Sequence, residues 1–306
     1  MSFRKILIPI DGTPVSRWAL TRTEGLLQRP GSSVKILGVV PATREQAVDP
    51  LYAADPRHKP LHDTLGAIKA AYEKRRLDVD AEIRFGAPAI EILREAATGG
   101  HDLIAMATHG RSGIDRILFG SVTLKVLQSC PIPMLLFRPL LRLDETVSPA
   151  EPDTPAAFSD VLVPLDGSHV AEEIVPAVET LARTCGSRLH LLTVVPGGPD
   201  EARHRQTALH DLERWRRIFA TLKIETAIDV RAGEPATEVL DCVRERGLDA
   251  VALTTHGRSG IARAIYGSVA EKVLTRATVP VLVLKSRITC PHPLELMGTT
   301  LRLEVP

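Results

Sequence analysis

The chain has 306 residues, 44% of them hydrophobic and 25% charged, which is the composition of a globular protein with about two domains. A formal net charge of +1 argues against nucleic acid as a partner, and no apolar segment approaches the roughly 20 residues of a membrane span. The four cysteines show no Cys-x-x-Cys spacing and the N-terminus shows no signal-peptide cleavage site, so we expect a cytoplasmic protein without zinc or dithiol chemistry.

Two apolar segments, Lys5–Ile10 and Val161–Leu165, are each followed by Asp-Gly and a hydroxyl residue. Their length and continuous apolar character predict strands that are buried on both faces. Thr13 and Ser168 then suit the N-caps of the helices that follow. Further strands are predicted, in the same order in both copies, at Val34–Val40, Val79–Phe85, Leu103–Ala107, Met134–Phe137, Arg188–Val195, Thr226–Arg231, Ala250–Thr254 and Val281–Leu284.

Helices are predicted between these strands, at Arg17–Leu27 and Leu61–Arg76 in copy one and at Ala171–Cys185 and Asp200–Leu222 in copy two. Copy one also has a longer polar, proline-containing connection, Ala42–Lys59, before its second helix. Alternating strands and helices predict an α/β fold, with a doubly wound parallel sheet in each copy. In such sheets, ligands bind beyond the carboxyl ends of the strands.

A glycine-bearing stretch, Thr108–Val122, recurs at Thr255–Val269 with its first seven residues unchanged. In both copies it ends in Gly-Ser at the expected start of a helix. Glycine there permits a close backbone approach, and the unpaired N–H groups of a helix N-terminus attract anions such as phosphate. A tight packing turn is the alternative interpretation. Binding is favoured because this stretch and the Asp-Gly both follow strand ends, and so converge on one crevice.

These motifs resemble those of the universal stress protein family, in its tandem two-domain form. The family's signature is Gly, two residues, Gly, nine residues and then Gly-Ser or Gly-Thr. Ala107 and Thr254 replace the first glycine of this signature. The resemblance implies two five-stranded domains of the adenine nucleotide alpha hydrolase-like fold, with strand order 3-2-1-4-5. The residues that match the rest of the signature are Gly110, Gly120 and Ser121 in copy one and Gly257, Gly267 and Ser268 in copy two.

The resemblance also implies a site for ATP, with or without Mg²⁺, in each copy. The adenosine end would be held by Asp11 with Val39 in copy one and by Asp166 with Val194 in copy two. Because the β-branched residue that replaces the first glycine in copy two is larger than alanine, we expect copy one to bind at least as well. The phosphates would lie on Ala107, Gly110, Arg111, Gly120, Ser121 and Val122 in copy one and on Thr254, Gly257, Arg258, Gly267, Ser268 and Val269 in copy two.

Three functions remain open from the sequence. The first is an adenine-nucleotide-binding regulatory protein of the stress response, acting on an unknown protein partner. The second is a slow ATPase or phosphoryl-transfer enzyme, but Asp115 of copy one is Ala262 in copy two, so no catalytic carboxylate recurs. The third is a scaffold that binds no nucleotide. We assign no catalytic residue and no metal ligand, and we interpret His58 and His62 as solvated loop residues.

We place the domains at residues 1–139 and 160–286, with an exposed, proline-rich linker at 140–159 and a C-terminal tail at 287–306. In the expected strand order, the fifth strand of each domain is an apolar edge that something must cover. We therefore expect an intramolecular pseudo-twofold dimer of the two domains, strand five against strand five. A homodimer of the whole chain is compatible with this arrangement.

Overall fold

The computed structural model describes residues 2–108, 120–138, 155–255 and 267–286, and we call residues 2–138 the first half and 155–286 the second half. All ten predicted strands are present, each to within one residue at either end. They are β1 Lys5–Ile10, β2 Ser33–Pro41, β3 Asp78–Gly86, β4 Leu103–Ala107, β5 Met134–Phe137, β6 Asp160–Pro164, β7 Arg188–Val195, β8 Thr226–Ala232, β9 Ala250–Thr254 and β10 Val281–Leu284.

The strands form one sheet in the order β3-β2-β1-β4-β5-β10-β9-β6-β7-β8. Within each half they are parallel and follow the expected order 3-2-1-4-5. The halves meet where β5 pairs with β10 in the antiparallel direction, with Leu135 opposite Leu282. The two fifth strands are therefore in contact, as expected. The contact is continuous backbone pairing, so the molecule has one ten-stranded sheet instead of two separate sheets. Each fifth strand thereby supplies hydrogen-bond partners to the backbone of the other, and neither remains an exposed edge.

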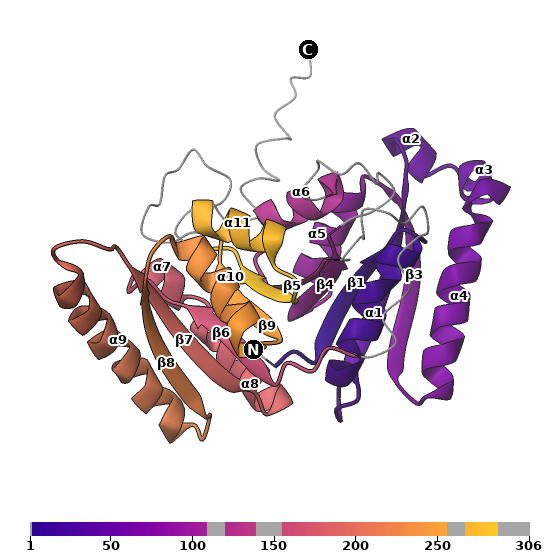
Figure 1. Cartoon of the computed structure of the whole chain (residues 1–306). Helices are drawn as coiled ribbons and strands as arrows, with labels where there is room; N and C mark the ends of the chain where they lie inside the picture. Colours follow the sequence, from indigo (N-terminus) through magenta and orange to yellow (C-terminus); the bar gives the residue numbers. More distant parts are fainter. Residues whose placement is uncertain (1, 109–119, 139–154, 256–266, 287–306) are drawn as a thin grey trace, which may run out of the picture.

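Helices cover both faces of this sheet. Those of the first half are α1 Pro14–Leu27, α2 Arg44–Ala47, α3 Pro50–Ala53, the 3-10 helix η1 Pro56–His58, α4 Lys59–Lys74, α5 Pro88–Thr98 and α6 Ser121–Ser129. Those of the second half are α7 His169–Glu172, α8 Val175–Cys185, α9 Glu201–Thr221, α10 Pro235–Arg246 and α11 Ser268–Arg276. Helices α1, α4, α8 and α9 lie on one face and α5, α6, α10 and α11 on the other, which gives three layers (Figure 1).

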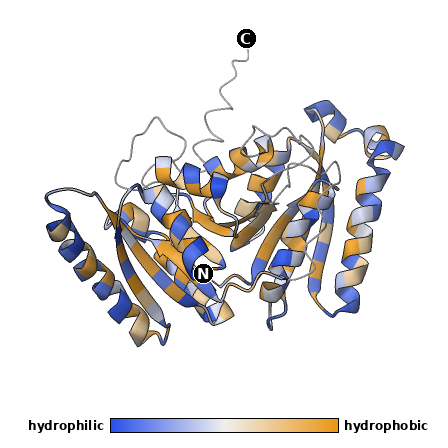
Figure 2. Ribbon diagram, in the orientation of Figure 1, coloured by the Kyte–Doolittle hydropathy of each residue, from blue (hydrophilic) through white to orange (hydrophobic). Residues whose placement is uncertain are grey.

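Strand β1 shows why the central strands are apolar at nearly every position. Ile6, Ile8 and Ile10 belong to the core on the α1 and α4 side, whereas Leu7 belongs to the core on the α5 and α6 side. Successive side chains of a strand point to opposite faces, so a strand covered on both faces must be apolar throughout. Figure 2 shows orange along these strands, while the outward faces of the helices carry blue.

The helix predicted at Ala171–Cys185 is divided into two. Helix α7 ends at Glu172 and α8 begins at Val175. Pro176 occupies the second position of α8 and has no N–H to donate to the preceding turn. Proline is tolerated in the first turn of a helix but not in its interior, so the chain starts a new helix here.

The predicted linker is not exposed at its C-terminal end, contrary to expectation. Ala156 and Phe158 are buried, and the Ala156 N–H donates to the carbonyl of Arg22 in α1 at 3.0 Å. These residues extend the core of the α1 face, so they tie the second half to the first. Residues 139–154 of the linker and residues 287–306 of the tail lie outside the described residues.

The polar connection predicted at Ala42–Lys59 is helical, since it forms α2, α3 and η1. Each of the three begins with a capping side chain that accepts a hydrogen bond from a backbone N–H of its own helix, and these capping residues are Thr43, Asp49 and Asp55 respectively. In the second half, only residues 196–200 separate β7 from α9. We call residues 42–58 the insert, because the second half has no counterpart of its short helices.

Candidate functional site

A cavity of about 510 Å³ opens at the carboxyl ends of β1, β2 and β4, beside the start of α6. We call it the first cavity. Its volume lies within the range of roughly 300–1,000 Å³ that small-molecule sites usually have. Its walls include all the described residues that were predicted to bind the nucleotide in copy one, which are Asp11, Val39, Ala107, Gly120, Ser121 and Val122.

The second half has a smaller cavity of about 230 Å³ at the corresponding place, which we call the second cavity. Its volume is below the usual range for small-molecule sites. Gly110, Arg111, Gly257 and Arg258 lie outside the described residues. The second cavity is lined by the described residues that were predicted for copy two, which are Asp166, Val194, Thr254, Gly267, Ser268 and Val269.

Each aspartate belongs to a hydrogen-bonded turn at the end of a strand. Asp11 Oδ1 accepts bonds from the Thr13 N–H at 3.0 Å and from the Thr13 hydroxyl at 2.6 Å. The same hydroxyl caps α1 by accepting the Ser16 N–H at 3.2 Å, so the predicted N-cap is confirmed. Asp166 and Ser168 repeat this arrangement, since Asp166 Oδ1 accepts bonds from the Ser168 N–H at 2.9 Å and from the Ser168 hydroxyl at 2.6 Å. In both halves, therefore, the helix cap fixes a carboxylate at the cavity wall.

The Gly-Ser steps begin α6 and α11. The Gly120 N–H donates to the Thr108 carbonyl at 2.8 Å, and the Gly267 N–H donates to the Thr255 carbonyl at 2.7 Å. Gly120 has φ −58°, which any residue can adopt, so its lack of a side chain matters for space and not for backbone strain. The N–H groups that follow, beginning with Ser121, have no acceptor within the helix and suit an anion.

Part of the first cavity's wall was not predicted from the sequence. Arg57 and His58 of the insert line it, together with Leu61 and Thr64 of α4. His58 is half-buried, so its interpretation as a solvated loop residue is wrong, whereas His62 is exposed. The only sequence signal was the extra length of copy one before its second helix. A length difference locates an insert but does not say which way its side chains face.

The insert contributes an ion pair to the rim of the first cavity. The Arg57 guanidinium lies 2.6 Å from Asp55 Oδ2. Hydrogen bonds from Arg57 lower the pKa of the Asp55 carboxyl to about 2. Both groups are therefore charged at neutral pH, and together they add no net charge to the rim.

The described residues offer little to metal or thiol chemistry. Among them, no group of three or more His, Cys, Asp or Glu side chains is placed to hold a metal ion. Burial raises the pKa of the Cys130 thiol, just after α6, to about 12, so this thiol is not a nucleophile at neutral pH. No helix in the described part of the chain is long and apolar enough to span a membrane.

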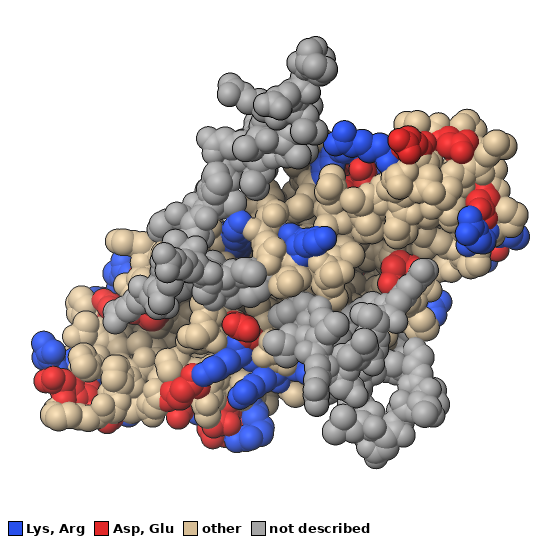
Figure 3. Space-filling view, turned by 90° about the horizontal axis from the view of Figure 1, so that it is seen from above, with Lys and Arg blue, Asp and Glu red and all other residues tan. Residues whose placement is uncertain are grey.

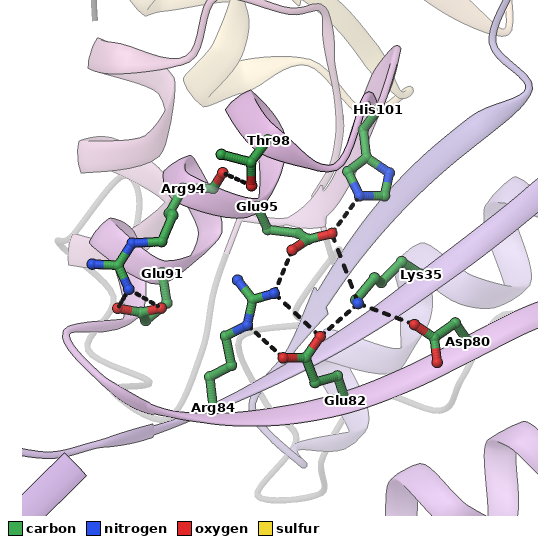
Figure 4. A network of polar contacts seen from close by, with 9 residues as sticks. All are labelled: Lys35, Asp80, Glu82, Arg84, Glu91, Arg94, Glu95, Thr98 and His101. Carbon is green, nitrogen blue, oxygen red and sulfur yellow. Dashed lines mark hydrogen bonds and ion pairs between the residues drawn. The ribbon is translucent and has the colours of Figure 1, made fainter. Parts of the chain in front are cut away.

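A network of ion pairs lies on the α5 face of the first half (Figure 4). Glu95 of α5 is 5% exposed; it accepts a bond from Arg84 Nη2 at 2.5 Å and lies 2.8 Å from His101 Nε2. Glu82 binds Arg84 Nε at 2.6 Å and Lys35 Nζ at 2.5 Å. Burial raises the pKa of Glu95, but the bonds to His101 and Arg84 outweigh it and leave the pKa below its usual value. None of these five residues lines the cavity, so we interpret the network as structural.

Figure 3 shows the charges on the face seen from above. In this view basic and acidic side chains lie close to one another, mainly near the edges and in the lower centre, and uncharged residues form most of the rest of the described surface.

Known proteins resemble this chain along most of its length. The model of the universal stress protein family matches residues 2–138 and 157–285. A universal stress protein of Mycobacterium tuberculosis is 27% identical over 238 residues, covering 71% of this chain and 74% of that protein. A putative universal stress protein of Staphylococcus epidermidis is 27% identical over 143 residues, covering 45% of this chain and 86% of that protein. The crystal structure of a universal stress protein from Archaeoglobus fulgidus shares the fold, with a TM-score of 0.71 and 22% identity, over 93% of this chain and 99% of that one.

Proposed function

Because the chain belongs to the universal stress protein family, we propose that it is a cytoplasmic regulatory protein of the stress response that binds ATP in its first cavity. The observation that carries the proposal is the two-ended character of this cavity. One end is formed by Val39 and its apolar neighbours with Asp11 beside them, and the other by the N-terminus of α6. An adenine nucleotide has the same character, since a flat base is joined through a ribose to anionic phosphates.

The ligand's orientation follows from this match. The base and ribose would lie at the ends of β1 and β2, near Asp11 and Val39. The phosphates would lie at Gly120 and Ser121, where the backbone N–H groups of α6 favour negative charge. Mg²⁺ is commonly held through substrate phosphates with few protein carboxylates, so it would enter with the nucleotide.

Gly120→Val tests the phosphate end. The backbone at Gly120 accepts any residue, so the fold should persist while the branched side chain fills the space that the phosphates need. We expect ATP affinity, measured by calorimetry on the full chain with Mg²⁺, to fall at least about tenfold, or by about 1.4 kcal/mol. Gly267→Val is the matched control, because the same change in the second half should leave the first cavity intact. Unchanged ATP affinity in Gly120→Val would contradict the proposal.

Asp11→Asn tests the adenosine end. Asparagine keeps an oxygen that can accept the two Thr13 bonds, so the turn and the helix cap should survive. Affinity for ATP should fall, whereas affinity for inorganic triphosphate should not. An equal loss for both ligands would place Asp11 at the phosphate end.

A further inference from the structure

The insert enters the first half immediately before a helix that both halves share. Helices α4 and α9 end in equivalent turns, since Arg76 and Lys223 follow them with φ of 59° and 60°. Counting back from these turns pairs the buried residues of the two helices, which are Leu61, Leu65 and Tyr72 in α4 and Ala208, Leu212 and Phe219 in α9. The same count pairs His58 with Arg205.

These two matched positions have different surroundings. His58 lines the first cavity. Arg205 does not line the second cavity; its guanidinium pairs with Glu201 at 2.7 Å and donates to the Val230 carbonyl at 2.6 Å. No residue of α9 or of the connection before it lines the second cavity. The insert therefore gives the first cavity a wall that the second lacks.

The His58 ring is supported by aromatic side chains. Its centroid lies 4.8 Å from that of Tyr52 and 5.3 Å from that of Phe85. The Tyr52 hydroxyl donates to the Pro41 carbonyl at 2.8 Å, which ties the insert to the end of β2. Tyr52 and Phe85 do not themselves line the cavity, so they contact the ring without being part of the cavity wall.

The polar atoms of the His58 ring are not used within the described part of the protein. Its Nδ1 is sealed from solvent and has no hydrogen-bond partner there. A ring that lines a cavity, packs against two aromatic neighbours and makes no hydrogen bond is suited to stacking. The neighbouring wall, formed by Val39, Val40 and Pro41, is apolar and accommodates a flat ring.

We propose that His58 stacks on the base of the nucleotide in the first cavity, and that the insert thereby makes this cavity the chain's high-affinity nucleotide site. This rests on the proposed function, because it assigns the base end of the same site. The ligand class is a nucleotide with a heteroaromatic base. The second cavity has about 230 Å³, and none of the described residues that line it is aromatic, so it binds such a base weakly or not at all.

The test is calorimetry on the full chain with two probes, ATP and inorganic triphosphate. Stacking of a base on an aromatic side chain contributes enough that alanine at His58 should weaken ATP binding about 5- to 100-fold. Triphosphate has no base, so its affinity should not change. His58→Phe preserves a flat ring without its nitrogens and should bind ATP within about threefold of the unaltered chain. Arg205→Ala, the matched change in the second half, should have no effect on ATP binding.

Two results would overturn the proposal. Either His58→Ala binds ATP as the unaltered chain does, or His58→Phe is as weak as His58→Ala, which would exclude stacking. A stoichiometry of two equally tight ATP molecules per chain would remove the inferred role of the insert. These outcomes differ from a failure of the proposed function, in which the unaltered chain itself does not bind ATP.

Discussion

The two halves have the same arrangement of strands and helices but differ in the size of their cavities and in some of their buried side chains. Both have the same strand order, the same Asp-hydroxyl turn and a glycine at the start of the corresponding helix. The first half has a cavity of about 510 Å³ that the insert helps to line, and the second half has one of about 230 Å³ and no such insert. On the α5 face, the buried pair Glu95 and His101 is matched in the second half by Cys242 and Leu248.

The difference shows which features the fold itself requires. Strand order and helix caps are present in both halves because each half must bury the same parallel sheet and start its helices after the same strands. A buried charged pair and an apolar pair can occupy the same place beneath the same helix, provided that the buried carboxylate has partners, as Glu95 has in Arg84 and His101. Arg231 of the second half also forms ion pairs, with Asp229 at 3.3 Å and with Glu245 at 2.9 Å. The first half has in addition the buried pair Glu95 and His101 and the insert, and substitutions can test each against its counterpart.

The largest effect is expected for Glu95→Ala. Removing this carboxylate leaves His101 and Arg84 without a buried acceptor, and breaking a buried ion pair is costly, so the free energy of unfolding should fall by about 3 kcal/mol. Cys242→Ala at the matching position removes one buried sulfur and should cost about 1 kcal/mol. Urea denaturation of both variants measures the difference. Equal losses would mean that the ion pairs of Glu95 contribute no more to the free energy of unfolding than the apolar packing of Cys242.

A somewhat smaller effect is expected for Gly38→Thr. A Cβ at Gly38 of β2 would lie 3.2 Å from Leu61 Cδ2, so threonine overpacks this contact and should cost about 2 kcal/mol. The second half has the opposite sizes at the matching positions, with Thr193 and Ala208. The double variant Gly38→Thr/Leu61→Ala should therefore recover most of the loss in thermal unfolding. A double variant less stable than Gly38→Thr alone would show that the packing of Thr193 and Ala208 cannot be transferred to the positions of Gly38 and Leu61.

The acid sensitivity of the first half depends partly on Glu82. A hydrogen bond from Arg84, reinforced by Lys35, lowers the pKa of Glu82 to about 2. A lowered carboxylate pKa gives stability that is present above about pH 4.5 and is lost as the pH falls towards 2. Because the side chain is 36% exposed, solvent screening should leave about 1 kcal/mol. Glu82→Gln should show this loss in denaturation at pH 7 and converge with the unaltered chain near pH 2; a loss independent of pH would point to packing.

The smallest effect is expected at the start of α10. Glu234 accepts the Thr237 N–H at 2.8 Å as an N-cap and lies 3.0 Å from Lys272, whereas Ala87 at the matching position of α5 makes no such bond. The Glu234 side chain is 46% exposed, so Glu234→Ala should cost only about 0.5 kcal/mol. Ala87→Glu should raise the free energy of unfolding by a similar amount, because it adds the missing N-cap to α5. Thermal unfolding of both variants checks the sign, and a destabilising Ala87→Glu would contradict it.

The sequence, with the family resemblance, was sufficient to predict the strands, the two N-caps and part of the lining of each cavity. Strand β1 must be apolar throughout because it is covered on both faces, and this pattern is visible without any tertiary information. Asp11 and Gly120 could be assigned to one crevice because the carboxyl ends of parallel strands share one edge of the sheet. The division of α7 from α8 at Pro176 was missed because a proline near a helix start is compatible with both one helix and two.

Local pattern thus determined the elements and the position of the cavities along the chain. Tertiary structure alone decided the rest, because the deciding contacts join residues that are far apart in sequence. Phe158 is buried only because the end of the linker packs against α1. Strand five against strand five was predicted, but only the folded chain shows that β5 and β10 join by antiparallel backbone pairing into one continuous sheet. His58 lines the first cavity, where its ring packs against Phe85 of β3 and Tyr52 of the insert. No periodicity in the sequence predicts these contacts.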